Sequence, residues 1–138
     1  MDFSFSEEQQ LLKDSLQRYL EREYSFDARR KRIKAGTGLS AEVWRALAEM
    51  GLLGLPFGAE HGGFAGSGVD SMLVMEAFGR SLVVEPYLAT VLLCGGLIDQ
   101  AGSPTQKAHW LPRIAAGNAI MAFAHGEADA RHDWRYVN

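Results

Sequence analysis

Histidine and acidic residues gather near the C-terminal end of the sequence, in the segment "HGEADARHD". Imidazole and carboxylate groups are common ligands of divalent metals, so residues this dense could coordinate an ion. A strand that ends in a polar loop explains the same composition, and we favour this interpretation over a metal site. The candidate ligands are His125, Glu127, Asp129, His132 and Asp133.

The glycine-rich stretch "GLLGLPFGAEHGGFAGSGVDSM", residues 51–72, could in principle cradle a phosphate. A dinucleotide-binding loop follows a strand and opens a helix, so that the phosphate meets the helix N-terminus. This stretch follows a helical pattern instead, and it lacks the Gly-Lys-Ser/Thr ending of a P-loop. We therefore predict a connection between two helices that needs positive-φ positions, with Phe57 and Phe64 packing it against the core.

The other groups that could do chemistry are interpreted as structural. Glu76 and Glu85 lie beside apolar residues, but no second titratable group at helical spacing supports an acid–base pair. Cys94 lies within "TVLLCGGLI" and is predicted to be a small buried residue. A single cysteine excludes an internal disulfide and fits a reducing compartment.

A chain of 138 residues with 47% hydrophobic residues suffices for one compact domain. Its formal net charge of −3 gives no electrostatic reason to expect nucleic acid or an anionic membrane as a partner. The basic run Arg29–Lys34 is predicted to be a solvated helix face, because no aromatic residue interleaves it. The acidic N-terminus lacks a signal-peptide pattern, and the apolar stretch Tyr87–Ile98 is too short to span a bilayer. We therefore expect a cytoplasmic protein.

Serine caps mark the starts of three helices. Ser6, Ser40 and Ser103 each precede a helical pattern, and the first and last have a glutamine three residues later, as in a capping box. Residues from 69 onward return to helical spacing, and a proline then restarts the chain as the helix Tyr87–Ala101. That helix is apolar nearly all round and is predicted to be buried. The fold class expected is all-α, an up-and-down domain of about five or six helices.

Only one segment reads as a strand. "AIMAFAH", residues 119–125, is short and apolar and lies between Gly117 and Gly126. A strand needs a neighbour for its backbone donors and acceptors, and nothing else in the sequence reads as one. We therefore predict a helical domain over residues 1–117 and, over residues 118–138, the start of a β-domain whose remainder is missing.

Four segments occur in an order that is typical of one family: "MDFSFSEEQQLLKDSLQRYLERE", "VWRALAEMGLLGLPFGAEHGGFAG", "MLVMEAFGRSLVVEPYLAT" and "SPTQKAHWLPRIAAG". Together they resemble the N-terminal helical domain of the acyl-CoA dehydrogenases over nearly the whole chain. Within that family, they most resemble bacterial small subunits of pimeloyl-CoA-type dehydrogenases.

The resemblance implies a flavoenzyme that introduces an α,β double bond into an acyl-CoA thioester. A glutamate removes the α-proton while hydride leaves the β-carbon for the FAD ring. The implied architecture is a helical N-domain, a middle β-domain and a C-terminal helical bundle, with subunits that pair or form tetramers. This chain would supply the first third without the catalytic glutamate. We therefore expect it to be inactive alone and to bind FAD weakly or not at all.

The resemblance also implies site residues near the C-terminal end. The family's first middle-domain strand reads approximately "ALTEPGAGSD" and contacts the flavin, and the matching piece here is "AHGEADARHD". Phe123, His125 and Gly126 fall at flavin contacts, although Gly126 replaces a threonine and so loses a side-chain hydrogen bond. His132 replaces a serine that meets the thioester end of the substrate, and Arg131 replaces a glycine. These departures suit a specialised or non-catalytic subunit.

The helical domain of this family walls one side of the acyl pocket. By position, the resemblance points to Tyr87, Leu88, Val91 and Leu92 as acyl-chain contacts, although packing in the core explains the same residues. The glycine-rich stretch would then orient the helices that build this wall.

Two other functions fit the same sequence: a stand-alone helical module that binds a partner protein, and a non-catalytic partner subunit. Each would use the apolar wall as its binding surface. Because large apolar patches rarely stay exposed to solvent, we expect the chain to form a homo-oligomer or to bind a partner subunit.

Overall fold

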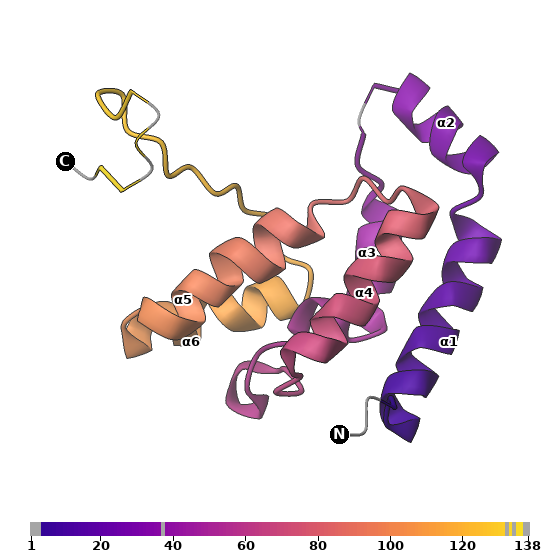
Figure 1. Ribbon diagram of the computed structural model, residues 1–138, viewed down its shortest axis with the longest axis horizontal. Helices are drawn as coiled ribbons and strands as arrows, with labels where there is room; N and C mark the ends of the chain where they lie inside the picture. Colours follow the sequence, from indigo (N-terminus) through magenta and orange to yellow (C-terminus); the bar gives the residue numbers. More distant parts are fainter. Residues whose placement is uncertain (1–3, 37, 132, 134, 137–138) are drawn as a thin grey trace.

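The computed structural model describes residues 4–36, 38–131, 133 and 135–136, and these form an up-and-down arrangement of helices, as predicted (Figure 1). The α-helices are α1 (Glu7–Glu23), α2 (Phe26–Lys34), α3 (Ala41–Glu49), α4 (Gly68–Ser81), α5 (Gly96–Ala101) and α6 (Pro104–Ala115). A π-helix, Leu88–Gly95, leads directly into α5, and two short 3₁₀ turns, Leu52–Gly54 and Ala59–His61, lie between α3 and α4.

The predicted serine caps form at the helix starts. The Ser6 side chain accepts a hydrogen bond from the Gln9 amide and the Gln9 side chain accepts one from the Ser6 amide, so the capping box is complete. The same reciprocal pair joins Ser103 and Gln106 at the start of α6. Each cap contributes about 1 kcal/mol, which helps to fix where the helices begin.

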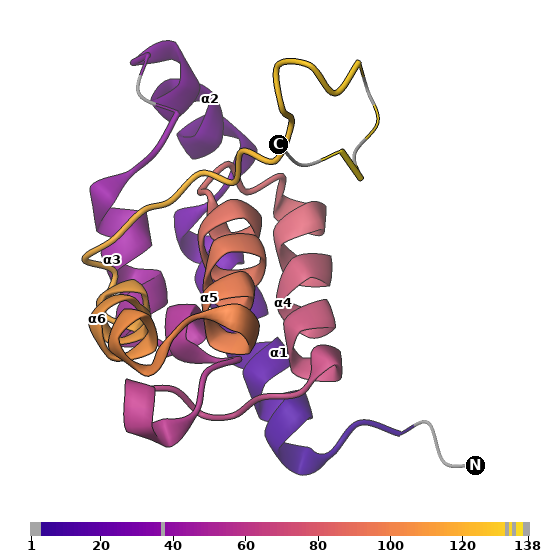
Figure 2. The ribbon, with the colours of Figure 1, turned by 90° about the vertical axis from the view of Figure 1, so that its left-hand side faces the viewer.

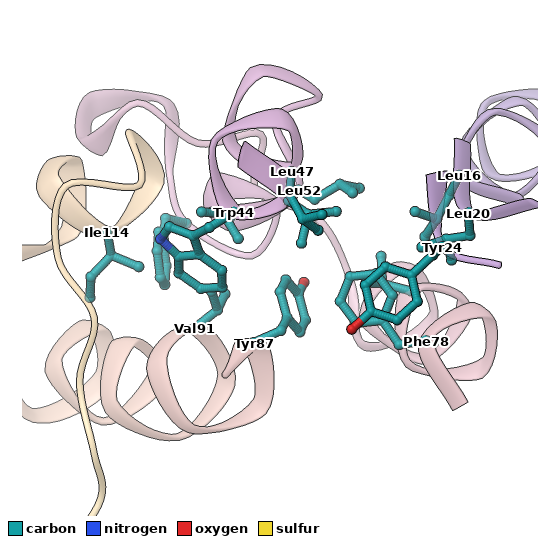
Figure 3. Packing of buried hydrophobic residues seen from close by; sticks show 14 of the residues in the cluster. Leu16, Leu20, Tyr24, Trp44, Leu47, Leu52, Phe78, Tyr87, Val91 and Ile114 are labelled. Atoms are coloured by element: carbon teal, nitrogen blue, oxygen red, sulfur yellow. The ribbon is translucent and has the colours of Figure 1, made fainter. Parts of the chain in front are cut away.

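One hydrophobic core runs through the bundle (Figure 3). Helices α1 and α4 lie side by side, and α3, the first 3₁₀ turn, the π-helix and α6 enclose the other side. Leu16 and Leu20 from α1, Leu47 from α3 and Val91 from the π-helix are almost wholly buried. The apolar stripes read from the sequence therefore point inward on several helices at once.

The glycine-rich stretch between α3 and α4 packs through one of its two phenylalanines. Phe57 is fully buried, and its ring lies so close to Gly95 that a Cβ there would come within 2.5 Å of it. Phe64 is 68% exposed and lies over Gly51, so the expectation that it reaches the core is wrong. Gly51 adopts φ 76°, in the left-handed region that favours glycine, and a Cβ there would come within 2.6 Å of the Phe64 ring. The absence of a side chain at Gly51 therefore makes room for Phe64.

A buried carboxylate joins three segments of the bundle. Glu85 accepts hydrogen bonds from the Tyr24 hydroxyl at 2.8 Å and from the Ser40 amide at 3.3 Å. The Tyr24 hydroxyl in turn accepts a hydrogen bond from the Val84 amide at 2.9 Å. The end of α1, the start of α3 and the link between α4 and the π-helix therefore meet at Glu85, which confirms its structural interpretation.

Helix α2 stands away from the bundle and buries none of its residues (Figures 1 and 2). Two of its cations reach back to the body: Arg29 donates to the Leu82 carbonyl at 2.7 Å, and Arg32 donates to the Glu23 carbonyl at 2.9 Å. The other cations lie in solvent, in agreement with the predicted solvated face. Among the described residues, no helix is both long and apolar enough to cross a membrane.

The helix that follows Pro86 differs from its prediction on one side. Tyr87 and Val91 are fully buried, but Leu88, Leu93 and Leu97 are 49%, 42% and 54% exposed. The prediction that this helix is buried all round is therefore wrong, because no other part of the described chain covers its outer face.

The predicted strand does not form within the described residues. After Gly117 the chain runs extended, with Ala119 and Met121 half-buried and Ile120 exposed, in the alternation of a strand. It lies across the helices and along no second extended segment of the described chain, so no sheet ladder can form (Figure 2).

Candidate functional site

An apolar surface extends from the outer face of the π-helix and α5 onto the extended segment. Leu93 and Leu97 protrude from the helix, and Ile120 and Phe123 protrude from the segment, all at least 42% exposed. A shallow hollow between Leu97 and Phe123 is floored by Cys94 and Met121. We call these residues together the outer apolar face. Its two halves come from segments that are about 25 residues apart in sequence.

The four residues that were predicted to contact an acyl chain do not share one side of their helix. Tyr87 and Val91 are fully buried in the core, and Tyr87 packs edge-on against Phe78 with ring centroids 5.2 Å apart. Leu88 points outward and Leu92 is half-buried. Only Leu88 and Leu92 are therefore open to a ligand.

The residues predicted to contact a flavin lie on the extended segment beyond Met121. The rings of Phe123 and His125 are stacked, with centroids 5.5 Å apart and an angle of 11° between their planes. Both side chains and Gly126 are exposed. His132, the predicted contact at the thioester end, lies outside the described residues.

Burial changes the acidity of two groups near this surface. It raises the pKa of the Cys94 thiol, which keeps the sulfur protonated and a poor nucleophile. It also raises the pKa of the Tyr87 phenol, whose hydroxyl has no hydrogen-bond partner among the described residues. Neither group is suited to proton transfer at neutral pH.

The glycine-rich stretch offers no free helix N-terminus to a phosphate. Ser67 caps α4, and the Asp70 carboxylate accepts from both the amide and the hydroxyl of Ser67 at 2.6 Å. The hydrogen bond from the Ser67 hydroxyl lowers the pKa of Asp70, so a negative charge already occupies the place where an anion would bind. This geometry fits the predicted role of a connection between helices.

The tail residues considered as metal ligands do not converge within the described part of the chain. No group of three or more histidine, cysteine, aspartate or glutamate side chains there is arranged to hold an ion. His125 instead stacks on Phe123, and Asp133 accepts from the Arg135 amide at 3.0 Å.

Two residues of interest escaped the sequence analysis. Leu93 is exposed like Leu88, five residues before it, because the wider turn of the π-helix brings residues five apart closer to one face than an α-helix would. Thr90 is fully buried, and its hydroxyl bonds to the backbone of Met121. The contact of Thr90 could have been suspected from the sequence, because a threonine inside an otherwise apolar helix is unusual. The exposure of Leu93 could not, because nothing in the sequence indicates a π-helix.

Comparison with known proteins gives a consistent result. Residues 6–118 match the family model described as the acyl-CoA dehydrogenase N-terminal domain. The acyl-CoA dehydrogenase FadE12 of Mycobacterium tuberculosis is 34% identical over 137 residues, which cover 94% of this chain and 34% of that protein. The acryloyl-CoA reductase (NADH) of Anaerotignum propionicum is 30% identical over 134 residues, which cover 96% of this chain and 34% of that protein.

Two solved structures share the fold. One is the ChsE4–ChsE5 complex from Mycobacterium tuberculosis, with a TM-score of 0.84 and 27% identity over 94% of this chain and 36% of that one. The other is the electron transferring flavoprotein of Acidaminococcus fermentans, with a TM-score of 0.82 and 28% identity over 97% of this chain and 35% of that one. The chain thus spans about a third of the length of the proteins that it matches.

Proposed function

Because the chain belongs to the acyl-CoA dehydrogenase family, we propose that it is the N-terminal part of an FAD-dependent enzyme that forms an α,β double bond in an acyl-CoA thioester. The observation that carries this proposal is the outer apolar face, where an uncovered helix meets an uncovered extended segment. Residues 1–117 would form the helical domain, and residues 118–138 would begin a β-domain that covers this face.

In this proposal the helix after Pro86 contributes the wall for the acyl chain. Leu88 and Leu92 would contact the chain directly, and Leu93 would extend the wall, because these side chains face outward or are half-buried. Tyr87 and Val91 would support the wall from behind, since both are fully buried in the core.

The extended segment fits a flavin in two respects. The exposed rings of Phe123 and His125 offer flat surfaces for stacking, and the backbone of residues 122–126 makes no hydrogen bond within the described chain. We propose that Phe123, His125 and Gly126 contact FAD, which accepts a hydride when bound. His132 would meet the thioester end of the substrate. We assign the catalytic base to no residue of this chain.

A second candidate, a non-catalytic partner subunit or a helical interaction module, is favoured by the same exposed leucines. One of the related structures is itself a complex of two named components. In either case we expect a homo-oligomer or a partner subunit, because burial of the outer apolar face would contribute about 25 cal/mol per Å². The cytoplasmic location expected from the sequence stays a prediction.

Absorbance spectroscopy tests the function. The chain alone is expected to show no tight yellow complex with FAD, whereas the protein that also carries the sequence after Asn138 is expected to bind FAD and to reduce an artificial acceptor with acyl-CoA. Leu88→Glu in that protein should raise KM at least tenfold, while the control Leu11→Glu, on an exposed part of α1, should not. A flavin-free, inactive protein, or a reading frame that stops after Asn138, would replace this proposal with the interaction module.

A further inference from the structure

Two side chains of the helical body form hydrogen bonds with the backbone of the extended segment. The Trp44 indole donates to the Gly117 carbonyl at 3.2 Å, where the chain leaves α6. Four residues later, the Thr90 hydroxyl accepts from the Met121 amide at 3.0 Å and donates to the Met121 carbonyl at 3.1 Å. A hydroxyl has one donor and two lone pairs, so this one group satisfies both backbone groups of Met121.

The Thr90 contact takes the place of a neighbouring strand. In a sheet, a residue of one strand exchanges both its amide and its carbonyl bonds with its partner. Here a fully buried side chain on a helix makes both bonds, and the segment keeps strand-like alternation although no strand lies beside it among the described residues. The contact therefore fixes which residues face the body, since a slip by one residue would turn Met121 outward.

Among the described residues, Thr90 makes the last hydrogen bond between the body and the segment. Within the described chain, the backbone of residues 122–126 makes no hydrogen bond, and the next bond, from the Ala130 amide to the Glu127 carbonyl, is local to the tail. The residues proposed to contact FAD lie two, four and five positions beyond Met121. The position of these residues relative to the helical bundle therefore depends on the contact between Thr90 and Met121.

The helix that carries Thr90 is itself firmly seated. Gly95 allows the ring of Phe57 to pack against the π-helix, and Val91 and Tyr87 are fully buried on the same inward side. Leu88, two residues before Thr90, points outward. The same helix therefore carries the proposed acyl contact Leu88 and, through Thr90, binds the backbone of the extended segment.

From this geometry we propose that Thr90 is a positioning residue, which sets the distance between the acyl wall at Leu88 and Leu92 and the flavin-contacting residues Phe123, His125 and Gly126. The importance of this distance rests on the proposed function. The contact between Thr90 and Met121 does not rest on the proposed function. An experiment can therefore refute the contact and the proposed function separately.

Amide hydrogen exchange in the chain of residues 1–138 tests the contact. In the unmodified chain, the Met121 amide is expected to exchange at least tenfold more slowly than the Phe123 amide. Thr90→Val keeps the shape of the side chain without the hydroxyl and should remove that difference, whereas Thr90→Ser should preserve it. Thr105→Val is the matched control, because Thr105 is exposed on the first turn of α6. Equal exchange at Met121 and Phe123 in the unmodified chain overturns the proposal even if Thr90→Val fails to fold.

The positioning role is tested in the protein that carries the remaining sequence and binds FAD. Thr90→Val is expected to change the visible flavin spectrum and to lower kcat at least tenfold, with Thr90→Ser restoring both and Thr105→Val leaving both unchanged. Loss of Met121 protection with an unaltered spectrum and kcat would show that the contact is only structural and overturns the proposal. An unmodified protein without flavin would instead refute the proposed function and leave the exchange result standing.

Discussion

The junction around Glu85 and the extended segment after Gly117 are both held by hydrogen bonds from buried side chains, but the two regions differ in how many constraints they have. At the junction, the Glu85 carboxylate accepts hydrogen bonds from the Tyr24 hydroxyl and the Ser40 amide. The Tyr24 hydroxyl also accepts one from the Val84 amide. The segment has Trp44 at one end and Thr90 four residues later. The conformation of the helical body is therefore fixed by contacts within the body. The extended segment is fixed only at its start, and its remaining backbone groups and exposed side chains are available to a further part of the protein or to a partner.

The strongest test of this difference is the packing of the glycine-rich stretch. Phe57→Ala is expected to lower the free energy of unfolding by about 3–5 kcal/mol, because the ring is fully buried against Gly95. Phe64→Ala, in the same stretch, should cost well under 1 kcal/mol, since Phe64 is 68% exposed. Chemical denaturation measures both, and similar losses for the two variants would contradict the structure.

The buried carboxylate should give the next largest effect. Glu85→Ala leaves the Tyr24 hydroxyl and the Ser40 amide without their acceptor, so we expect a loss of about 2–3 kcal/mol. Glu76→Ala is the control, because Glu76 makes a surface ion pair with Arg80 that is worth about 0.3–0.5 kcal/mol. An equal loss in both variants would mean that the junction adds no more than a surface pair.

Two buried tyrosines make a narrower test. Tyr24→Phe removes a hydroxyl with partners on both sides and should cost about 1 kcal/mol. Tyr87→Phe removes a hydroxyl that is buried without a partner among the described residues, so it should be neutral or slightly stabilising. Thermal unfolding of the two variants side by side measures the difference, and a costly Tyr87→Phe would reveal a partner for that hydroxyl.

The same junction predicts a dependence on alkaline pH. Burial, together with the hydrogen bond to the Glu85 carboxylate and its negative charge, raises the pKa of Tyr24 to about 12, although the hydrogen bond from the Val84 amide acts in the opposite direction. In the unfolded chain the pKa of tyrosine lies near 10. The folded state therefore keeps the proton longer, and this stability is fully present below pH 10 and is lost as the pH rises toward 12. Stability measured from pH 9 to 12 should fall less steeply in Tyr24→Phe than in the unmodified chain.

The smallest effect should come from the extended segment. Phe123→Ser is expected to change the free energy of unfolding by no more than about 0.5 kcal/mol, because the side chain is 43% exposed and its ring stacks on the exposed His125. The same substitution in a flavin-binding parent should weaken FAD binding measurably. A large loss of stability in the chain itself would show that the segment belongs to the core. The segment would then be held as firmly as the junction around Glu85, against our expectation.

Local patterns in the sequence predicted much of the helical body. The boxes at Ser6 and Ser103 and the stripe that includes Leu16 and Leu20 depend on residues within one or two turns, so they can be read without knowing the fold. The same reasoning failed at Phe64 and on the outer side of the helix after Pro86, because exposure there depends on which other segments arrive.

The candidate site was predicted less completely for the same reason. The resemblance pointed by position to one helix and grouped Tyr87 and Val91 with Leu88 and Leu92. The structure buries the first two residues in the core and also exposes Leu93, which was not predicted. The role of Thr90 depends on a residue 31 positions away, and no short-range pattern can show such a contact.

The sequence by itself determined where most helices begin, which family the chain resembles and that one apolar ribbon needs a neighbour, because caps, periodicity and backbone hydrogen-bonding requirements act over a few residues. Only the tertiary structure decided that Phe57 and not Phe64 enters the core, that Glu85 joins three segments and that Thr90 holds Met121. Those outcomes come from contacts between distant parts of the chain, where the burial of one side chain depends on the simultaneous placement of all the others.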